Sequence, residues 1–160
     1  MVKKKALSLP EVAQTLRPFK EGDSLELDEL WSYIYDKSNK CWVWIAMCTR
    51  TRQVVAWVTG RRDEERCQAL WDRIPAAYQR SIIYTDFYAA YERVLRAAGA
   101  IFRCVGKDTG LTNHVERWNG TLRQRVGRFV RKTLSFSKCE KMHNLMLKLF
   151  IHEYNTSLLL

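Results

Sequence analysis

Three acidic residues lie where the sequence could bring their carboxylates together. Asp28 lies in the segment "ELDEL", Asp86 ends the apolar segment "SIIYTD", and Glu116 lies in the basic segment "TNHVERWNGTLRQRVGRF". An apolar strand that ends in Asp directs a carboxylate out of the carboxyl end of a sheet, where ligands of α/β proteins bind. Grouped carboxylates repel one another unless cations neutralise them, and hard divalent ions such as Mg²⁺ or Mn²⁺ prefer oxygen ligands. The three residues therefore form a candidate site for a divalent metal ion.

Each of these acids also has an ordinary structural explanation. An Asp is tolerated at the edge or end of a strand, and an Asp directly after a strand often caps the next helix. A Glu on a helix is usually a solvated surface charge. Two neighbours of Asp28 are further candidates: Glu26 shares its face of the strand and is the better backup ligand, whereas Glu29 faces the opposite side.

The segment around Glu116 is predicted to be an amphipathic helix with a basic surface. At about 100° per residue, one apolar stripe is formed by Val115, Trp118, Leu122, Val126 and Phe129. Beside that stripe, Glu116 shares a flank with Thr112, Asn119 and Arg123. Basic residues around a carboxylate–metal centre suit phosphodiester chemistry, because metals clamp the attacking and leaving oxygens while Lys and Arg hold phosphates. We predict nucleic-acid contacts from Arg117, Asn119, Arg123, Arg125, Arg128, Arg131, Lys132 and Lys138. A plain solvated loop is the alternative for residues 128–138.

The composition agrees with a protein that binds a polyanion. The 160 residues carry 27 Lys+Arg against 17 Asp+Glu, a formal net charge of +10, and 47% are hydrophobic. Nucleic acid is the first candidate partner for such a surface, and a negatively charged membrane surface is the second. No apolar run approaches the roughly 20 residues of a spanning helix, and no cleavable leader opens the chain, so we expect a cytoplasmic protein. The five cysteines are scattered and are expected to be buried reduced thiols rather than a zinc site.

The elements that must position these residues can be read from periodicity. Strands are predicted over residues 24–36, 41–49, 53–60, 81–86 and 100–105, and helices over 7–19, 63–74, 87–99, 112–129 and 137–155. Three consecutive strands followed by alternating helices and strands predict one five-stranded mixed sheet flanked by helices. This α/β order is the ribonuclease H-like arrangement.

Four segments of the sequence resemble the catalytic part of a bacterial insertion-sequence transposase of the IS1 family. They are "LELDELWSYI", "YTDFYAAYE", "NHVERWNGTLRQR" and "RFVRKTLSFSK", which occur in the family's order over roughly residues 24–140. The resemblance implies a ribonuclease H-like DDE fold in which Asp28, Asp86 and Glu116 are the catalytic, metal-binding triad. It also implies that Arg123 is the basic residue that such transposases carry on the same helix.

The activity implied by the resemblance is Mg²⁺-dependent cleavage of DNA at the element ends, followed by joining of the freed 3′-OH to target DNA. The implied partners are element-end and target DNA, and a homo-oligomer assembled on DNA. Family members also carry a zinc-binding module and a helix-turn-helix upstream, for which this chain lacks metal-ligand cysteines. Residues 1–23 are therefore expected to be a basic helix and linker, a remnant of that helix-turn-helix, and residues 24–160 the catalytic domain.

Two other functions use the same features. One is a catalytically silent, basic DNA-binding module derived from a transposase, and the other is a metal-dependent nuclease of the same fold. His114, at a helix start just before Glu116, is predicted to be structural, with a contact to DNA or metal as the alternative. His143 and His152 are predicted to lie on the surface of the last helix.

Overall fold

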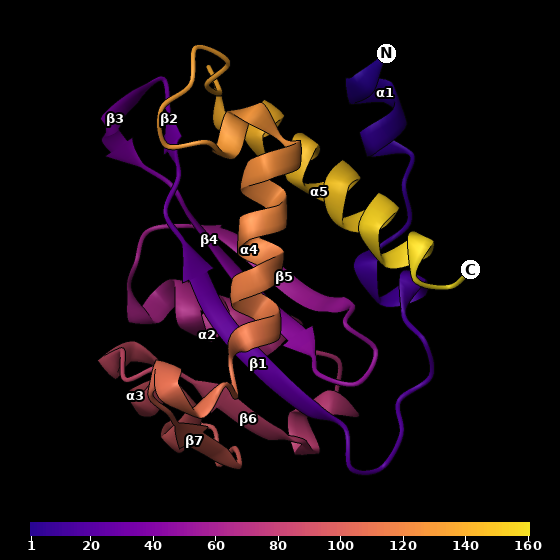
Figure 1. The fold of residues 1–160 in the computed structure, drawn as a ribbon, viewed down its shortest axis with the longest axis vertical. Coiled ribbons are helices and arrows are strands. Elements are labelled where there is room, and N and C mark those ends of the chain that lie inside the picture. Colours follow the sequence, from indigo (N-terminus) through magenta and orange to yellow (C-terminus); the bar gives the residue numbers. More distant parts are fainter.

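A five-stranded mixed sheet forms the centre of the protein, which the computed structural model describes over residues 1–160. Its strands, in spatial order, are β5 (Val54–Gly60), β4 (Trp42–Cys48), β1 (Ser24–Leu30), β6 (Ile82–Thr85) and β7 (Phe102–Cys104). β1, β4 and β5 form an antiparallel meander, whereas β6 pairs in parallel with both β1 and β7. The predicted five-stranded mixed sheet is confirmed (Figure 1).

Helices cover both faces of this sheet, because its central strands are apolar on both sides. α2 (Glu64–Arg73) and α3 (Ala89–Ala97) pack on one face, and α4 (Asn113–Arg125) and α5 (Glu140–Ser157) on the other. Successive residues of β4 point to opposite faces, so Trp44 belongs to the α2–α3 core and Ile45 to the α4–α5 core. In Figure 1, α4 crosses in front of β1, which places one flank of that helix beside the end of the strand.

The first predicted strand, residues 24–36, is too long. β1 ends at Leu30, and the chain then forms a separate hairpin of β2 (Tyr33–Ile34) and β3 (Asp36–Lys40). Tyr35 joins these two strands with a φ of 69°, a left-handed conformation that non-glycine residues seldom adopt. The Tyr35 amide donates a hydrogen bond to the carbonyl of Ser137 (2.6 Å), so a distant segment holds the turn.

The predicted N-terminal helix over residues 7–19 is wrong. The chain has α1 (Val2–Leu7) and a 3₁₀ turn (Val12–Thr15). Proline disfavours helix in the residue before it, so Pro10 interrupts the predicted helix and Pro18 ends the stretch in which the 3₁₀ turn forms. The turn is held by the body of the protein, since Gln53 Nε2 donates to the Thr15 carbonyl (2.8 Å) and Asn155 Nδ2 donates to Thr15 Oγ1 (2.9 Å). The division at residue 23 stays a prediction.

The two C-terminal helices start inside their predicted limits, but α5 (Glu140–Ser157) continues past its predicted end at residue 155. α4 stops at Arg125 and a 3₁₀ turn (Gly127–Phe129) follows, while α5 begins at Glu140. The apolar stripe predicted for α4 is confirmed, because all five of its residues are buried. In the last helix, helical spacing predicts an apolar stripe of Met142, Leu145, Met146, Leu149 and Phe150, but only Leu145 of these is buried. The residues that α5 buries are His143, Leu145, Leu147, Ile151 and Asn155.

The surface position predicted for His143 is therefore wrong. Its ring is fully buried and has a hydrogen-bonding partner at each nitrogen, Ser32 at Nε2 (2.9 Å) and Ser137 at Nδ1 (2.7 Å). A buried polar group is tolerated when it is hydrogen-bonded, and both partners come from other parts of the chain.

The cysteines are all free, as predicted, but they are not all buried. Cys41, Cys48 and Cys67 are buried, Cys104 is half-buried, and Cys139 is exposed directly before α5. None of the helices is long and apolar enough to cross a membrane.

Candidate active site at the ends of strands β1 and β6

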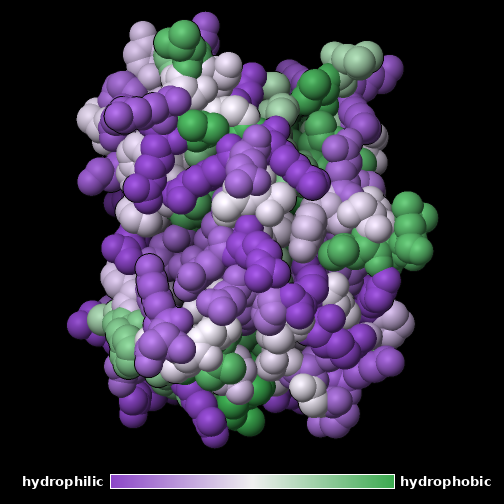
Figure 2. All heavy atoms as spheres, in the orientation of Figure 1, coloured by the Kyte–Doolittle hydropathy of each residue, from purple (hydrophilic) through white to green (hydrophobic).

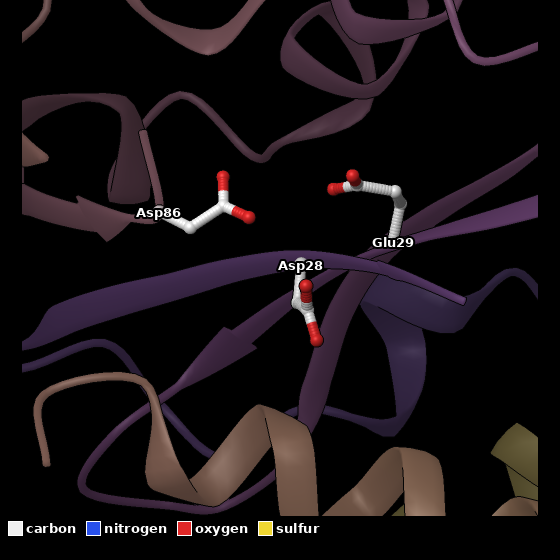
Figure 3. Close-up of side chains that lie close together, drawn as sticks. All are labelled: Asp28, Glu29 and Asp86. Atoms are coloured by element: carbon white, nitrogen blue, oxygen red, sulfur yellow. The ribbon is translucent and has the colours of Figure 1, made fainter. Parts of the chain in front are cut away.

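Two of the predicted acidic residues lie side by side at one edge of the sheet. Glu26 of β1 is paired with Tyr84 of β6, so Asp28 and Asp86 follow two residues later on neighbouring parallel strands. β6 ends at Thr85, whereas β1 continues to Leu30, and this leaves one edge of β1 open. Carboxylate oxygens of Asp28, Asp86 and Glu29 lie within 4.8 Å of one another. Figure 3 shows Asp86 and Glu29 on one side of the β1 ribbon and Asp28 on the other.

Asp28 is a mostly buried carboxylate without a cationic partner. Asn119 Nδ2 donates a hydrogen bond to its Oδ2 (2.8 Å). Burial raises the pKa of Asp28 to about 7, and the negative charges of Glu29, Asp86 and Glu116 add to the increase. A bound cation would stabilise this carboxylate more than an exposed one. The cation would offset both the repulsion from the neighbouring carboxylates and part of the free-energy cost of burying the charge.

Asp86 is held by the turn that leads into α3. Its Oδ1 accepts a hydrogen bond from the amide of Tyr88 (2.9 Å), and Tyr88 is the residue that precedes the helix. One carboxylate oxygen is thus fixed by the backbone of a turn, but Asp86 does not cap the helix, whose N-cap residue is Tyr88. The other oxygen has no hydrogen-bonding partner in the protein.

Glu116 approaches the same place from α4. Its Oε1 accepts a hydrogen bond from Thr112 Oγ1 (3.0 Å) one turn earlier. Glu116 lies outside the close group of carboxylates, but it lines one cavity of about 290 Å³ together with Asp28 and Asp86. The predicted flank of the helix is confirmed, since Thr112, Glu116, Asn119 and Arg123 all line this cavity.

The predicted nucleic-acid contacts divide into two groups. Those in the cavity wall are Asn119, Arg123 and Arg131, and those outside it are Arg117, Arg125, Arg128, Lys132 and Lys138. All five residues of the second group are exposed except Arg128, which is half-buried. Burial and the nearby Arg131 lower the pKa of Arg123. Figure 2 shows that hydrophilic side chains dominate the middle of the face that α4 crosses.

Two buried polar atoms in the cavity wall lack a protein partner. They are the Asn119 Oδ1 acceptor and the Arg123 Nε donor. Buried polar groups are nearly always hydrogen-bonded, so such orphaned atoms mark a place where a ligand or water completes the structure.

Glu26 does not act as the backup ligand that the sequence suggested. It is fully buried on the same face as Asp28, but its carboxylate accepts hydrogen bonds from the His114 amide (3.0 Å) and His114 Nδ1 (2.8 Å). A carboxylate at the N-terminus of a helix is favourable, because the first amides of the helix have no partner within it. Glu26 therefore fixes the start of α4, and His114 has the structural role predicted for it.

The sequence reasoning missed two basic residues of the cavity, Arg62 and Lys107. The position of Arg62 could have been predicted from the direction of the strands. β5 runs in the same direction as β1, because each of them is antiparallel to β4. The residues that follow β5 therefore emerge at the same edge of the sheet as Asp28. Lys107 lies in a 3₁₀ turn after β7, and no comparable pattern identifies it.

Comparison with known proteins agrees with this geometry. The model of a family described as IS1 transposase matches residues 24–156. The chain belongs to the IS1 transposase family. Similar relatives include the insertion element iso-IS1n protein InsB of Shigella dysenteriae, which is 32% identical over 133 residues that cover 81% of this chain and 94% of that protein. The IS1 protein InsB of Shigella flexneri is 34% identical over 119 residues, which cover 74% of this chain and 86% of that protein.

Solved structures agree with the ribonuclease H-like fold. The integrase catalytic core domain of HTLV-2, solved in complex with magnesium, matches with a TM-score of 0.55 and 12% identity over 84% of this chain and 86% of that one. An integrase-containing structure, the simian T-cell lymphotropic virus intasome, matches with a TM-score of 0.58 and 13% identity over 84% of this chain and 49% of that one. The predicted fold is confirmed, and residues 24–156 of this IS1-family member are a transposase catalytic domain.

Proposed function

We propose that this IS1-family domain cuts DNA strands at the ends of an insertion element and joins the freed 3′-OH to target DNA. The observation that carries the proposal is the placement of Asp28 beside Asp86 in a cavity that Glu116 and Arg123 also line. Carboxylates and arginines in one cavity suit a phosphodiester, since the carboxylates can hold cations and the arginines can hold phosphates.

Mg²⁺ or Mn²⁺ suits the donor set of this cavity. Asp28, Asp86 and Glu116 offer only oxygen, and none of them forms an ion pair with a basic side chain. The orphaned Asn119 Oδ1 is a further oxygen in the wall. We propose these three acids as the residues that hold the metal, whose chemistry would be Lewis-acid stabilisation of the charge that develops on phosphate oxygens.

The residues around the triad fix its side chains before DNA binds. Asn119 orients Asp28, the Tyr88 amide orients Asp86, and Thr112 orients Glu116. Each of these hydrogen bonds engages one carboxylate oxygen and leaves the other unbonded within the protein. Preorganised side chains reduce the free energy that would otherwise be needed to assemble the site at the moment of reaction.

The two proposed reactions are substitutions at phosphorus. In cleavage, a water oxygen forms a bond to phosphorus, the bond to the 3′ oxygen breaks, and the proton that water loses is balanced by the proton that the 3′ oxygen gains. In joining, the oxygen of that 3′-OH forms a bond to a phosphorus of the target, and the bond from this phosphorus to the target's own 3′ oxygen breaks. The proton that the attacking hydroxyl loses is balanced by the proton that the leaving 3′ oxygen gains. Arg123 and Arg131, which line the cavity, are proposed to hold the phosphates that flank the reacting one. The exposed basic residues outside the cavity are proposed to contact the duplex further away, and we propose that the protein works as a homo-oligomer on DNA.

The variant Asp86→Asn tests this proposal. It keeps the side-chain shape and the ability to accept from the Tyr88 amide, since Asn and Asp side chains both hydrogen-bond to their own backbone two residues on. We expect nicking and strand transfer of a DNA carrying the element ends to fall by at least roughly 100-fold, as a metal ligand is worth more than its supporting residues. DNA affinity should survive, and the melting temperature without metal should hold or rise.

Asp63→Asn is a matched control, because Asp63 is an ordinary helix cap whose Oδ1 accepts from the Arg66 amide (3.0 Å). Its nicking activity should be unchanged. Full activity of Asp86→Asn would end the hypothesis that Asp86 is a catalytic metal ligand. No nicking by the unaltered protein would leave the silent DNA-binding module. Nicking without joining in the unaltered protein would instead favour the nuclease.

A further inference from the structure

Arg62 lines the proposed active-site cavity and is held by three side chains, those of Tyr88, Trp42 and Glu29. It follows β5, and its guanidinium carbon lies 4.2 Å from the ring centroid of Tyr88 and 4.8 Å from that of Trp42. The Tyr88 hydroxyl donates to the Arg62 carbonyl (2.8 Å). Arginine packs on aromatic rings through its planar guanidinium, and such packing restricts the side chain to few rotamers.

Glu29 completes this arrangement from β1. Its Oε1 accepts from Arg62 Nε (2.9 Å) and Nη2 (2.6 Å), and its Oε2 accepts from the Tyr91 hydroxyl (2.7 Å). The Glu29 side chain is 2% exposed, whereas that of Arg62 is 39% exposed. Both carboxylate oxygens are therefore occupied by donors of the protein, in contrast to Asp28 and Asp86, which each keep an unbonded oxygen.

The exposed part of Arg62 faces the cavity that holds the carboxylates. Its Nη1 has no hydrogen-bonding partner in the protein, so the guanidinium keeps free donors after binding Glu29. Arg62 comes from the α2–α3 side of the sheet, and Arg123 comes from α4 on the other side. The cavity thus has an arginine on each side of β1.

We infer that Arg62 contacts a phosphate of the bound DNA and that Glu29 positions Arg62 instead of binding metal. This inference rests on the proposed function, because it needs DNA to enter the cavity. A rigid arginine with free donors is suited to a phosphate, since charge-assisted hydrogen bonds to a planar guanidinium are strong and directional. Glu29 lies close enough to the other acids to be mistaken for a ligand, but metal binding there would require it to release Arg62 and Tyr91.

Arg50 provides a matched control. It makes the same kind of pair, with Nε (2.5 Å) and Nη2 (2.8 Å) donating to Asp23, and the two side chains are 37% and 1% exposed. Asp23 precedes β1, so this pair lies at the opposite end of the strand from Glu29. A general effect of losing a semi-exposed arginine–carboxylate pair would appear equally in both variants.

The first experiment measures the binding of a fluorescein-labelled duplex of arbitrary sequence by anisotropy, in EDTA, over a range of salt concentrations. Arg62→Met keeps a flexible apolar side chain between the rings and removes the charge. The slope of log affinity against log salt concentration should become less steep by about 0.9, which corresponds to one phosphate contact. Arg50→Met should keep the slope of the unaltered protein. If Arg62→Met has the same slope as the unaltered protein, and that slope is steep, the inference about Arg62 is overturned while the proposed function stands.

The second experiment follows Mn²⁺ binding without DNA, and so separates the roles of the acids. Glu29→Gln should bind Mn²⁺ as the unaltered protein does, whereas Asp86→Asn should lose binding. Equal losses in both variants would make Glu29 a ligand and overturn its positioning role. Salt-independent DNA binding by the unaltered protein would overturn the proposed function as well.

A third measurement needs no variant, and so it decides the matter even where Arg62→Met does not fold. Phenylglyoxal modifies exposed arginines, and mass spectrometry reports each site. Addition of the duplex should protect Arg62 and leave Arg50 reactive. Equal reactivity of Arg62 with and without DNA would contradict a phosphate contact.

Discussion

At the scale of single residues, the acids of the proposed metal site differ from the neighbouring glutamates in how many of their carboxylate oxygens the protein already binds. Asp28 and Asp86 could be found because strand ends in an α/β sheet determine which residues meet. The roles of Glu26 and Glu29 could not, since they depend on partners from α4, α3 and the loop after β5. Alternation along the strand gave the correct face for both residues. This alternation gave no information on which carboxylate already accepts hydrogen bonds from other parts of the protein.

The pKa of Asp28 gives the first prediction at this scale. Burial raises that pKa to about 7, well above the value of about 3.9 expected in an unfolded chain. Between these values the folded state holds a proton that the unfolded state has lost, so metal-free stability should fall as the pH rises from 4 to 7. Asp28→Asn cannot lose a proton. At pH 7.5 in EDTA it should therefore be more stable than the unaltered protein, by roughly 1–4 kcal/mol.

Thermal melts at pH 4 and pH 7.5 test this expectation. The advantage of Asp28→Asn should be almost gone at the lower pH, where the folded carboxyl is protonated and the unfolded one is about half protonated. Asp36→Asn is the control, because Asp36 is exposed on β3 and burial costs its charge nothing. An advantage of Asp28→Asn that is the same at both pH values would show that charge burial is not its cause.

At the scale of elements, types were predicted better than boundaries. The helices over α2, α3, α4 and α5 follow from periodicity, since an apolar stripe repeats in each. The break after β1 does not, because the turn at Tyr35 is held by Ser137 from the segment before α5. The same segment receives a second contact from His143, which connects it to α5 and to Ser32. One buried histidine thus joins three elements that are distant in sequence.

The hydrogen bonds of His143 determine which of its ring nitrogens carries the proton. The Ser32 hydroxyl donates to the Cys41 carbonyl, so its oxygen must accept from Nε2–H of the ring. Nδ1 then accepts from the Ser137 hydroxyl. The neutral ring satisfies every partner, and burial together with the positive charge of Arg128 lowers the pKa of His143 to about 4.

This arrangement predicts a loss of stability in acid. Between pH 6.5 and 4 the unfolded state binds a proton at His143 that the folded state does not, so stability should fall as the pH is lowered through this range. The loss from this group should reach roughly 3 kcal/mol. His143→Gln should be less stable than the unaltered protein near neutral pH, with the difference shrinking towards pH 4. His152→Gln, on the same helix and half-buried, is the control and should show no such convergence.

At the scale of the whole molecule, the net charge of +10 predicts a polyanionic partner but not where it binds. Folding brings part of that charge beside the candidate active site, because the segment between α4 and α5 returns past the β2–β3 hairpin (Figure 1). Other basic residues lie elsewhere, such as Lys3 and Lys4 on α1, which packs near α5. The sequence shows both groups as similar basic runs. Only their position relative to Asp28 and Asp86 separates a DNA-binding surface from charge that keeps the protein soluble.

The last prediction compares these two groups at equal change in charge. Arg131 and Lys132 are both exposed in the segment between α4 and α5, and Arg131 also lines the cavity. Replacing both with Ala should weaken binding of every duplex about equally, because phosphate contacts carry no sequence information. The log–log salt slope should lose up to about 1.8, or 0.9 for each contact. Replacing Lys3 and Lys4 with Ala removes the same two charges and should leave the slope nearly unchanged, since α1 lies away from the active-site cavity. Equal losses of slope in the two double variants would mean that DNA responds to the total charge of the molecule and not to a surface beside the carboxylates.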